Sequence, residues 1–212
     1  MYRRGIQKGR FYKSGKVGVS MTKIYMLRHG ETDWNLAGKI QGGTDTVLNE
    51  KGKRQAIACR NYFQDKNCQA IFSSTLQRAR QTATIMNETL HLPLILIDEF
   101  KERNFGKAEG LTLDERLKLY PSKQYPNQES MESLCQRLAK GLHKIQQSYP
   151  HDEVILVTHG AVIHTIFDMV EKMTVFPEVP RLSNGGISTI SYEKEKWLLE
   201  TYNDTSYMTD LK

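Results

Sequence analysis

Two histidines of the chain each stand where an apolar segment ends and a glycine follows, and this repetition is harder to explain by core packing than either histidine alone. The first is His29, which follows Arg28, and the second is His159. Arg78 and Glu102 come after two further apolar segments. A neutral imidazole is a nucleophile near neutral pH, a guanidinium neutralises phosphoryl oxygens, and a carboxyl group gives and takes protons. Together these residue types suit the transfer of a phosphoryl group.

The apolar segments are expected to be β-strands that alternate with helices. Strands are predicted at residues 23–27, 70–73, 94–97 and 154–157, and helices at residues 52–63, 76–90, 112–119, 129–147 and 163–170. Residues 187–192 and 197–202 are predicted to pair as a closing hairpin. This alternation predicts an α/β domain with a mostly parallel sheet. The carboxyl ends of parallel strands meet at one edge, so the five chemical residues should converge there.

The composition is typical of a globular protein that can bury a core. The 212 residues are 39% hydrophobic and 25% charged. No segment approaches the roughly 18 consecutive apolar residues of a membrane span, so no membrane partner is expected. The three cysteines are too scattered for a disulfide framework or a zinc site. Free thiols favour a cytoplasmic protein.

The excess positive charge is confined to the first 20 residues. They hold six basic residues and no acidic one, whereas the other 192 residues hold 24 basic and 24 acidic residues. Two interpretations stay open: residues 1–20 are a flexible basic leader, or Met21 is the natural start of the single domain at residues 21–212. Nucleic acid is not the partner that the balanced domain predicts. Salt-dependent binding that is lost on deletion of residues 1–20 would assign such a role to the leader.

Four motifs in this order resemble the signatures of the histidine phosphatase superfamily, the phosphoglycerate mutase-like proteins. They are Arg28-His29-Gly30-Glu31-Thr32 with Asn35, the segment Ser73-Ser74 to Thr82-Ala83 around Arg78, Glu102 leading into Phe105-Gly106 and Glu109-Gly110, and Val157-Thr158-His159-Gly160. The resemblance runs from about residue 22 to residue 202. It implies a three-layer sandwich, with a mostly parallel central sheet between helices. At Lys107-Ala108 the chain departs from the bulky apolar residue that the family often has beside the acidic motif.

The resemblance also implies a role for each matched residue. His29 would take the phosphoryl group on a ring nitrogen, Glu102 would protonate the leaving group, and three residues would hold the phosphoryl oxygens: Arg28, Arg78 and His159. Substrate contacts are expected from Asn35, Gln41, Gly42, Gly160 and Arg103. Because two arginines and a second histidine replace the charge of a metal ion, neither a metal nor a cofactor is expected.

The expected activity is hydrolysis of a small, anionic, phosphorylated metabolite. Mutases of this family carry a long insertion before the second histidine motif, whereas only 48 residues separate Gly110 from His159 here. Two predicted helices fill most of that gap and leave residues 120–128 as a short lid. The alternatives are a phosphoglycerate mutase and a non-catalytic relative that binds phosphate or protein. Lys101, Arg103 and Lys123 are expected near the mouth of the site, and a homodimer is compatible with the sequence.

Overall fold

The computed structural model describes residues 21–171 and 182–209, so the predicted leader at residues 1–20 lies outside the described residues. The elements follow one another as β1 (Thr22–Arg28), α1 (Asp33–Leu36), α2 (Glu50–Phe63), β2 (Cys68–Ser73), α3 (Gln77–Leu90), β3 (Leu94–Leu96), α4 (Leu113–Leu119), α5 (Met131–Ser148), β4 (Glu153–Thr158), α6 (Gly160–Glu171), β5 (Ile187–Glu193) and β6 (Lys196–Asp204). Two short 3₁₀ turns, Asp98–Phe100 and Gly106–Ala108, lie between β3 and α4. The α/β prediction is confirmed.

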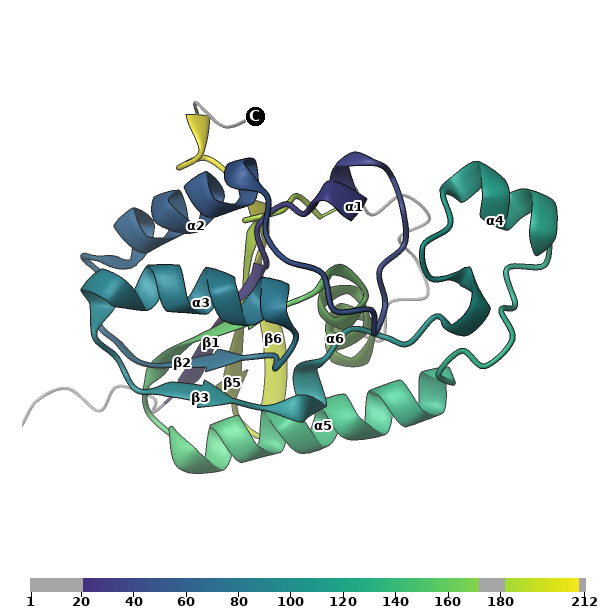
Figure 1. The fold of residues 1–212 in the computed structure, drawn as a ribbon. Coiled ribbons are helices and arrows are strands. Elements are labelled where there is room, and N and C mark those ends of the chain that lie inside the picture. The colour runs from purple at the N-terminus through teal and green to yellow at the C-terminus, as the bar shows by residue number, and fades with distance from the viewer. Residues whose placement is uncertain (1–20, 172–181, 210–212) are drawn as a thin grey trace, which may run out of the picture.

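One six-stranded sheet forms the centre of the molecule, with the strand order β3-β2-β4-β1-β5-β6 (Figure 1). The first four strands are parallel, whereas β5 is antiparallel to both β1 and β6. In the register of β1 with β4, Arg28 lies opposite Thr158. The backbone N–H of His29 then donates to the Thr158 carbonyl at 2.9 Å. This register brings the two His-Gly dipeptides together at the carboxyl edge of the sheet.

Helices cover both faces of the sheet and bury two separate apolar clusters. Figure 1 shows α2 and α3 on one face and α5 on the other. The first cluster includes Cys59, Phe63, Ala79, Ala83 and Met86, together with sheet residues such as Leu27 and Val157. The second includes Leu134, Leu138, Leu142, Ile145, Ile163 and Ile166. The expected three layers are therefore present.

The predicted helix boundaries shift where a side chain caps the first turn. α2 begins two residues before its predicted start because the Asn49 side chain accepts the N–H of Gly52 at 2.8 Å. α5 begins after Ser130, whose hydroxyl accepts the N–H of Ser133 at 3.1 Å. The four-residue α1 has no predicted counterpart, because a single turn is too short to show a helical period. Of the described helices, none has the length and apolar character to cross a membrane.

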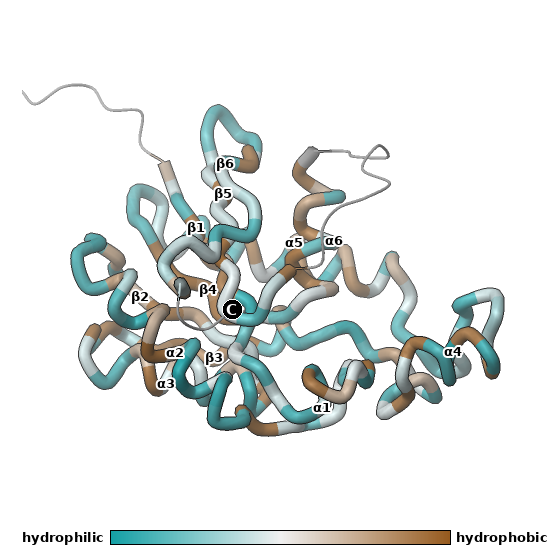
Figure 2. The backbone as a smooth tube through the Cα atoms, turned by 90° about the horizontal axis from the view of Figure 1, so that it is seen from above, coloured by the Kyte–Doolittle hydropathy of each residue, from teal (hydrophilic) through white to brown (hydrophobic). Residues whose placement is uncertain are grey.

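α4 stands apart from the two helical layers. In Figures 1 and 2 it lies at one end of the molecule, away from α2 and α3. It carries three exposed leucines, Leu113, Leu117 and Leu119. Two backbone hydrogen bonds anchor the segment before it to the loop after α1: Ile40 N–H donates to the Leu111 carbonyl at 3.0 Å, and Gly110 N–H donates to the Ile40 carbonyl at 2.8 Å. α4 thus reaches the active-site side of the sheet through contacts with a segment 70 residues earlier.

Candidate active site

His29 lies at the carboxyl edge of the sheet. Its side chain is almost fully buried, since the residue is only 2% exposed. Its Nδ1 is 2.7 Å from the Gly30 carbonyl oxygen. A carbonyl can only accept, so Nδ1 carries the proton and Nε2 keeps a free lone pair. Burial, followed by the charges of Arg78 and Arg28, holds the pKa of His29 well below its usual range. The imidazole is therefore neutral near pH 7, in the tautomer whose unprotonated Nε2 could act as a nucleophile.

Arg78 is fully buried and fixes the loop that forms the wall of the site. Its Nη1 donates to the Thr44 carbonyl and its Nη2 donates to the Gly42 carbonyl, both at 2.8 Å. Its Nε is buried and has no acceptor among the described residues. Since an unsatisfied buried donor is costly, this N–H is suited to an oxygen of the substrate.

Glu109 holds the same loop from its other side. Its carboxylate accepts the backbone N–H groups of Gly43, Thr44 and Phe105, each at 2.9 Å, and the Thr44 hydroxyl at 2.6 Å. Gly42 has a φ of +56°, and a Cβ atom there would lie 2.1 Å from a Glu109 oxygen. The loop therefore needs glycine at this position for two reasons, backbone conformation and space.

His159 lies beside His29, with 5.1 Å between the centroids of the two rings. It is completely buried, and its Nε2 is 2.8 Å from the Ser74 hydroxyl. Its Nδ1 has no partner among the described residues. Burial, followed by the positive charge of Arg78, lowers the pKa of His159 well below its usual value. His159 is thus a neutral ring beside His29, and its Nδ1 has no hydrogen-bond partner among the described residues. The contact of His159 with Ser74 was not predicted from the sequence.

Glu102 is half-buried next to the arginines. One carboxylate oxygen accepts the Arg103 N–H at 3.1 Å and the other accepts the Ala161 N–H at 3.3 Å. Burial raises the pKa of Glu102 above its usual value, and this effect outweighs the opposing attraction of Arg78. A carboxyl group with a raised pKa can be protonated at a higher pH, which is what a general acid requires.

Arg137 of α5 holds the backbone that carries Glu102. Its guanidinium donates to the carbonyls of Glu99 and Lys101, both at 2.7 Å, and to the carbonyl of Glu102 at 3.3 Å. Its Nε and Nη2 also bind the Glu129 carboxylate at 2.7 and 2.9 Å. A bidentate pair of this kind is geometrically specific. Arg137 is a positioning residue that sequence reasoning missed, since one arginine on an amphipathic helix gives no signal of its own.

Replacement of Arg137 by methionine should slow hydrolysis of an alkyl phosphate by roughly 10- to 100-fold, because small misplacements of a catalytic group have effects of this size. p-Nitrophenyl phosphate should lose much less activity, since its leaving group needs no proton. The control is Lys140→Gln on the same helix, which removes only a contact of 3.7 Å with Glu99. Steady-state assays of both esters compare the variants. Equal losses with both esters would show that Arg137 supports the fold rather than Glu102.

Four of the five predicted catalytic residues line a cavity of about 330 Å³, whereas the fully buried His159 is not among its lining residues. Of the predicted substrate contacts, Asn35, Gln41 and Gly42 line it together with Arg28, His29, Arg78 and Glu102. Gly160 instead packs against Arg28, whose Nε lies 3.6 Å from the position of a Cβ there. The structure directs Arg103 elsewhere: its Nε and Nη2 donate to the Glu129 carbonyl at 3.0 and 2.9 Å.

The cations at the mouth also differ from those that were expected. Lys101 pairs with Asp98 at 2.8 Å, and neither Lys101 nor Lys123 lines the catalytic cavity. Lys39, after α1, and Arg116, on α4, line it instead. The chain path around α1 and α4, which the sequence did not predict, decides which charges reach the mouth.

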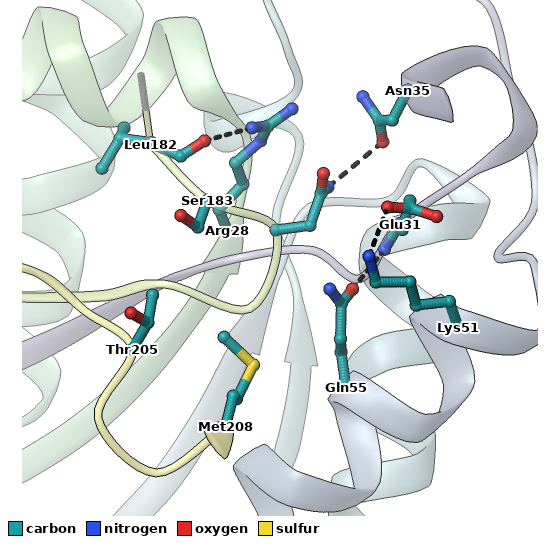
Figure 3. Close-up of a pocket in the computed structure, with 10 residues that line it drawn as sticks. Arg28, Glu31, Asn35, Lys51, Gln55, Leu182, Ser183, Thr205 and Met208 are labelled. Atoms are coloured by element: carbon teal, nitrogen blue, oxygen red, sulfur yellow. Dashed lines mark hydrogen bonds and ion pairs between the residues drawn. The ribbon is translucent and has the colours of Figure 1, made fainter. Parts of the chain in front are cut away.

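A second cavity of about 410 Å³ shares Arg28 and Asn35 with the first (Figure 3). There the Arg28 guanidinium donates to the Leu182 carbonyl, and Asn184 donates to the His29 carbonyl at 2.9 Å and to Asn35 Oδ1 at 3.1 Å. Because β5 is antiparallel to β1, the first residue of β5 lies opposite the end of β1, and residues 182–186 therefore lie beside His29. Asn184 thereby braces the nucleophile segment, and the turn signal Ser183-Asn184-Gly185-Gly186 was the only sequence clue to it.

Among residues 21–171 and 182–209, no group of three or more His, Cys, Asp or Glu side chains could hold a metal ion. The side chains around His29 include the guanidinium groups of Arg28 and Arg78, the imidazole of His159 and the carboxyl group of Glu102. This donor set suits a phosphoryl anion, which it can both neutralise and protonate.

Comparisons with known proteins agree with this geometry. A family model described as histidine phosphatase superfamily (branch 1) matches residues 24–205. The chain is 45% identical over 189 residues to an uncharacterized phosphatase PhoE of Bacillus subtilis, covering 89% of this chain and 98% of that protein. It is 30% identical over 210 residues to a metal-independent phosphoserine phosphatase of Arabidopsis thaliana, covering 92% and 87%.

A solved structure shares the fold over almost the same length. It is that of Bacillus stearothermophilus YhfR, with a TM-score of 0.82 and 25% identity over 88% of this chain and 99% of that chain. The family match spans β1 to β6 and includes every motif that places a group in the cavity. The chain is therefore an enzyme of the histidine phosphatase superfamily and belongs to its branch 1.

Proposed function

We propose that this enzyme hydrolyses a small, anionic phosphomonoester through a phosphohistidine formed on Nε2 of His29. The observation that carries the proposal is the hydrogen bond between His29 Nδ1 and the Gly30 carbonyl, which leaves Nε2 unprotonated. The cavity beside it holds the Arg28 and Arg78 guanidinium groups and the Glu102 carboxyl group. Phosphoryl transfer depends chiefly on positioning and charge neutralisation, and this site offers both.

The reaction proceeds in two displacements at phosphorus. In the first, the lone pair of His29 Nε2 forms the N–P bond while the bond to the ester oxygen breaks. Glu102 gives its proton to the leaving oxygen, while Arg28, Arg78 and His159 hold the phosphoryl oxygens. In the second, Glu102 takes a proton from water, the hydroxide oxygen bonds to phosphorus, and the N–P bond breaks. Inorganic phosphate leaves, and His29 and Glu102 return to their starting forms.

Two further observations favour hydrolysis of a small substrate. The cavity of about 330 Å³ is near the lower end of the range for small-molecule sites, about 300–1,000 Å³. Between Gly110 and His159 the chain has only α4, α5, β4 and their connections, so it carries no long insertion to enclose a phosphorylated intermediate. Relatives that include a phosphoserine phosphatase support the same class of substrate.

The experiment that tests this function is a panel of phosphorylated metabolites, assayed for released phosphate and analysed for isomerised products. We expect stoichiometric phosphate and alcohol from the preferred ester. An isomerised phosphate ester as the main product would instead make the enzyme a mutase. Binding of the esters without any turnover would make it a non-catalytic relative.

Removal of divalent metal ions should leave the activity unchanged, because Arg28 and Arg78 neutralise the charge of the phosphoryl group and the neutral His159 ring can only form a hydrogen bond with it. The measurement is phosphate release after prolonged dialysis against EDTA, with a metal-dependent phosphatase treated in parallel as the control. Loss of activity that a divalent ion restores would contradict the proposed neutralisation by side chains.

A further inference from the structure

The outer wall of the catalytic cavity carries two positive charges that the phosphoryl chemistry does not use. They belong to Lys39 and Arg116, and both residues line the same cavity as His29. Their segments are linked by the two backbone hydrogen bonds between Ile40 and residues 110–111. Trp34 lies against Gly110, with 3.3 Å from its ring to the position of a Cβ there. Lys39 and Arg116 therefore lie on linked segments, and both line the mouth of the cavity.

Arg116 has few partners for a half-buried guanidinium. Its Nη1 donates to the Tyr125 hydroxyl at 3.1 Å, whereas its Nε is buried and has no acceptor among the described residues. No carboxylate of residues 21–171 or 182–209 forms an ion pair with it. Glu115, its neighbour, is engaged in capping α4, where it accepts the N–H and the hydroxyl of Thr112 at 2.7 and 2.8 Å. Arg116 thus keeps a charge and an N–H without a counterpart.

Positive side chains outnumber negative side chains in the lining of the cavity. Among the described residues, four cationic side chains line it, from Arg28, Lys39, Arg78 and Arg116, against the one carboxyl group of Glu102. A phosphomonoester brings two negative charges, which Arg28 and Arg78 match beside His29. The charge of Arg116 then has no counterpart unless the rest of the substrate supplies one. The apolar side chains of Phe105 and Leu113 line the same cavity and can contact a short carbon skeleton.

We infer that the substrate carries a second anionic group, a carboxylate or a further phosphate, and that Arg116 binds it while Lys39 assists. This inference rests on the proposed function and narrows its substrate class. A guanidinium presents paired N–H donors that fit a carboxylate or a phosphate. Lys39 is exposed, so its contribution should be the smaller of the two because solvent screens it.

The test compares substrate pairs that differ in one charge. 3-Phosphoglycerate and glycerol 3-phosphate differ by a carboxylate, and fructose 1,6-bisphosphate and fructose 6-phosphate differ by a phosphate. We expect the kcat/KM of the wild type to be roughly 10- to 100-fold higher for the member of one pair that carries the additional anionic group. This factor is the usual effect of a hydrogen bond to a charged group. Arg116→Gln should bring that ratio close to one, through KM more than kcat. Lys118→Gln, an exposed cation on the same helix, is the matched control and should keep the ratio.

A charge-reversed variant gives a second readout that a folding defect would not produce. Arg116→Glu should favour phosphoethanolamine over phosphoserine, the reverse of the wild-type preference. Calorimetric binding of the same pairs to His29→Ala protein repeats the comparison without turnover, so failure of the proposed hydrolysis is distinguishable from failure of this inference. Two results would overturn it: no charge preference in either pair for the wild type, or a preference that Arg116→Gln leaves intact.

Discussion

His29→Ala should reduce phosphate release by roughly 10³-fold or more while the protein stays folded, because no other described group can form the covalent intermediate in the same place. The ring is held by one hydrogen bond to the Gly30 carbonyl, so its removal leaves the surrounding strands paired. The measurement is phosphate release at saturating substrate, with circular dichroism and thermal unfolding to verify the fold.

The matched control for this substitution is His143→Ala, which removes an exposed histidine from α5 and should leave the activity unchanged. Folded His29→Ala protein that keeps more than a few per cent of wild-type activity would remove His29 from the role of nucleophile. His159 would then be the ring to consider, since the centroids of the two rings are 5.1 Å apart.

Glu102→Gln should slow hydrolysis of an alkyl phosphate by roughly 10²- to 10⁴-fold, the usual size of a general acid–base contribution. Glutamine keeps the shape, and its one side-chain oxygen can still accept either the Arg103 or the Ala161 N–H group, so substrate binding should change little. With a p-nitrophenyl ester the loss should be much smaller, because nitrophenolate leaves without a proton. The comparison is made on the first turnover, as a burst of alcohol against a burst of nitrophenol, since slow breakdown of phosphohistidine would affect both esters alike.

The pH profile provides a second test of the same residue. Because burial raises the pKa of Glu102, its acid form persists to a higher pH than that of an ordinary glutamate. First-turnover rates for the alkyl ester should therefore fall as the pH rises through this raised pKa, and Glu102→Gln should abolish that fall. His29 stays neutral over the same range because its own pKa is lowered. Equal losses for the two esters, or an unchanged pH profile, would assign Glu102 to ion pairing with Arg78.

The convergence of His29 and His159 could be predicted from sequence because it depends only on strands being parallel and ending at one edge. The His-Gly dipeptides mark the ends of β1 and β4, and any pairing that places these strands side by side brings the two rings together. Strand order and register were not predictable, since they depend on packing of both faces. The contact of Asn184 with the His29 carbonyl was therefore not predicted, because it depends on β5 running antiparallel to β1.

The substrate end of the cavity could not be predicted for a different reason. Arg103 is one residue from Glu102, yet its guanidinium turns to the Glu129 carbonyl, whereas Arg116 reaches the cavity from α4. The position of α4 depends on backbone hydrogen bonds between Ile40 and Leu111, which lie 71 residues apart and leave no periodic signal. Local sequence thus predicts which groups could react, and long-range contacts decide which charges surround them.

The most direct test of the account is to trap the covalent intermediate and identify the nitrogen that carries phosphorus. Rapid quench of the enzyme with p-nitrophenyl phosphate, followed by alkaline digestion and mass spectrometry, locates the modified residue, and ³¹P NMR distinguishes the two ring isomers. The account predicts an acid-labile phosphoryl group on Nε2 of His29, because Nδ1 is hydrogen-bonded to the Gly30 carbonyl at 2.7 Å. A phosphoryl group on Nδ1, on another residue, or on no residue during active turnover would contradict it.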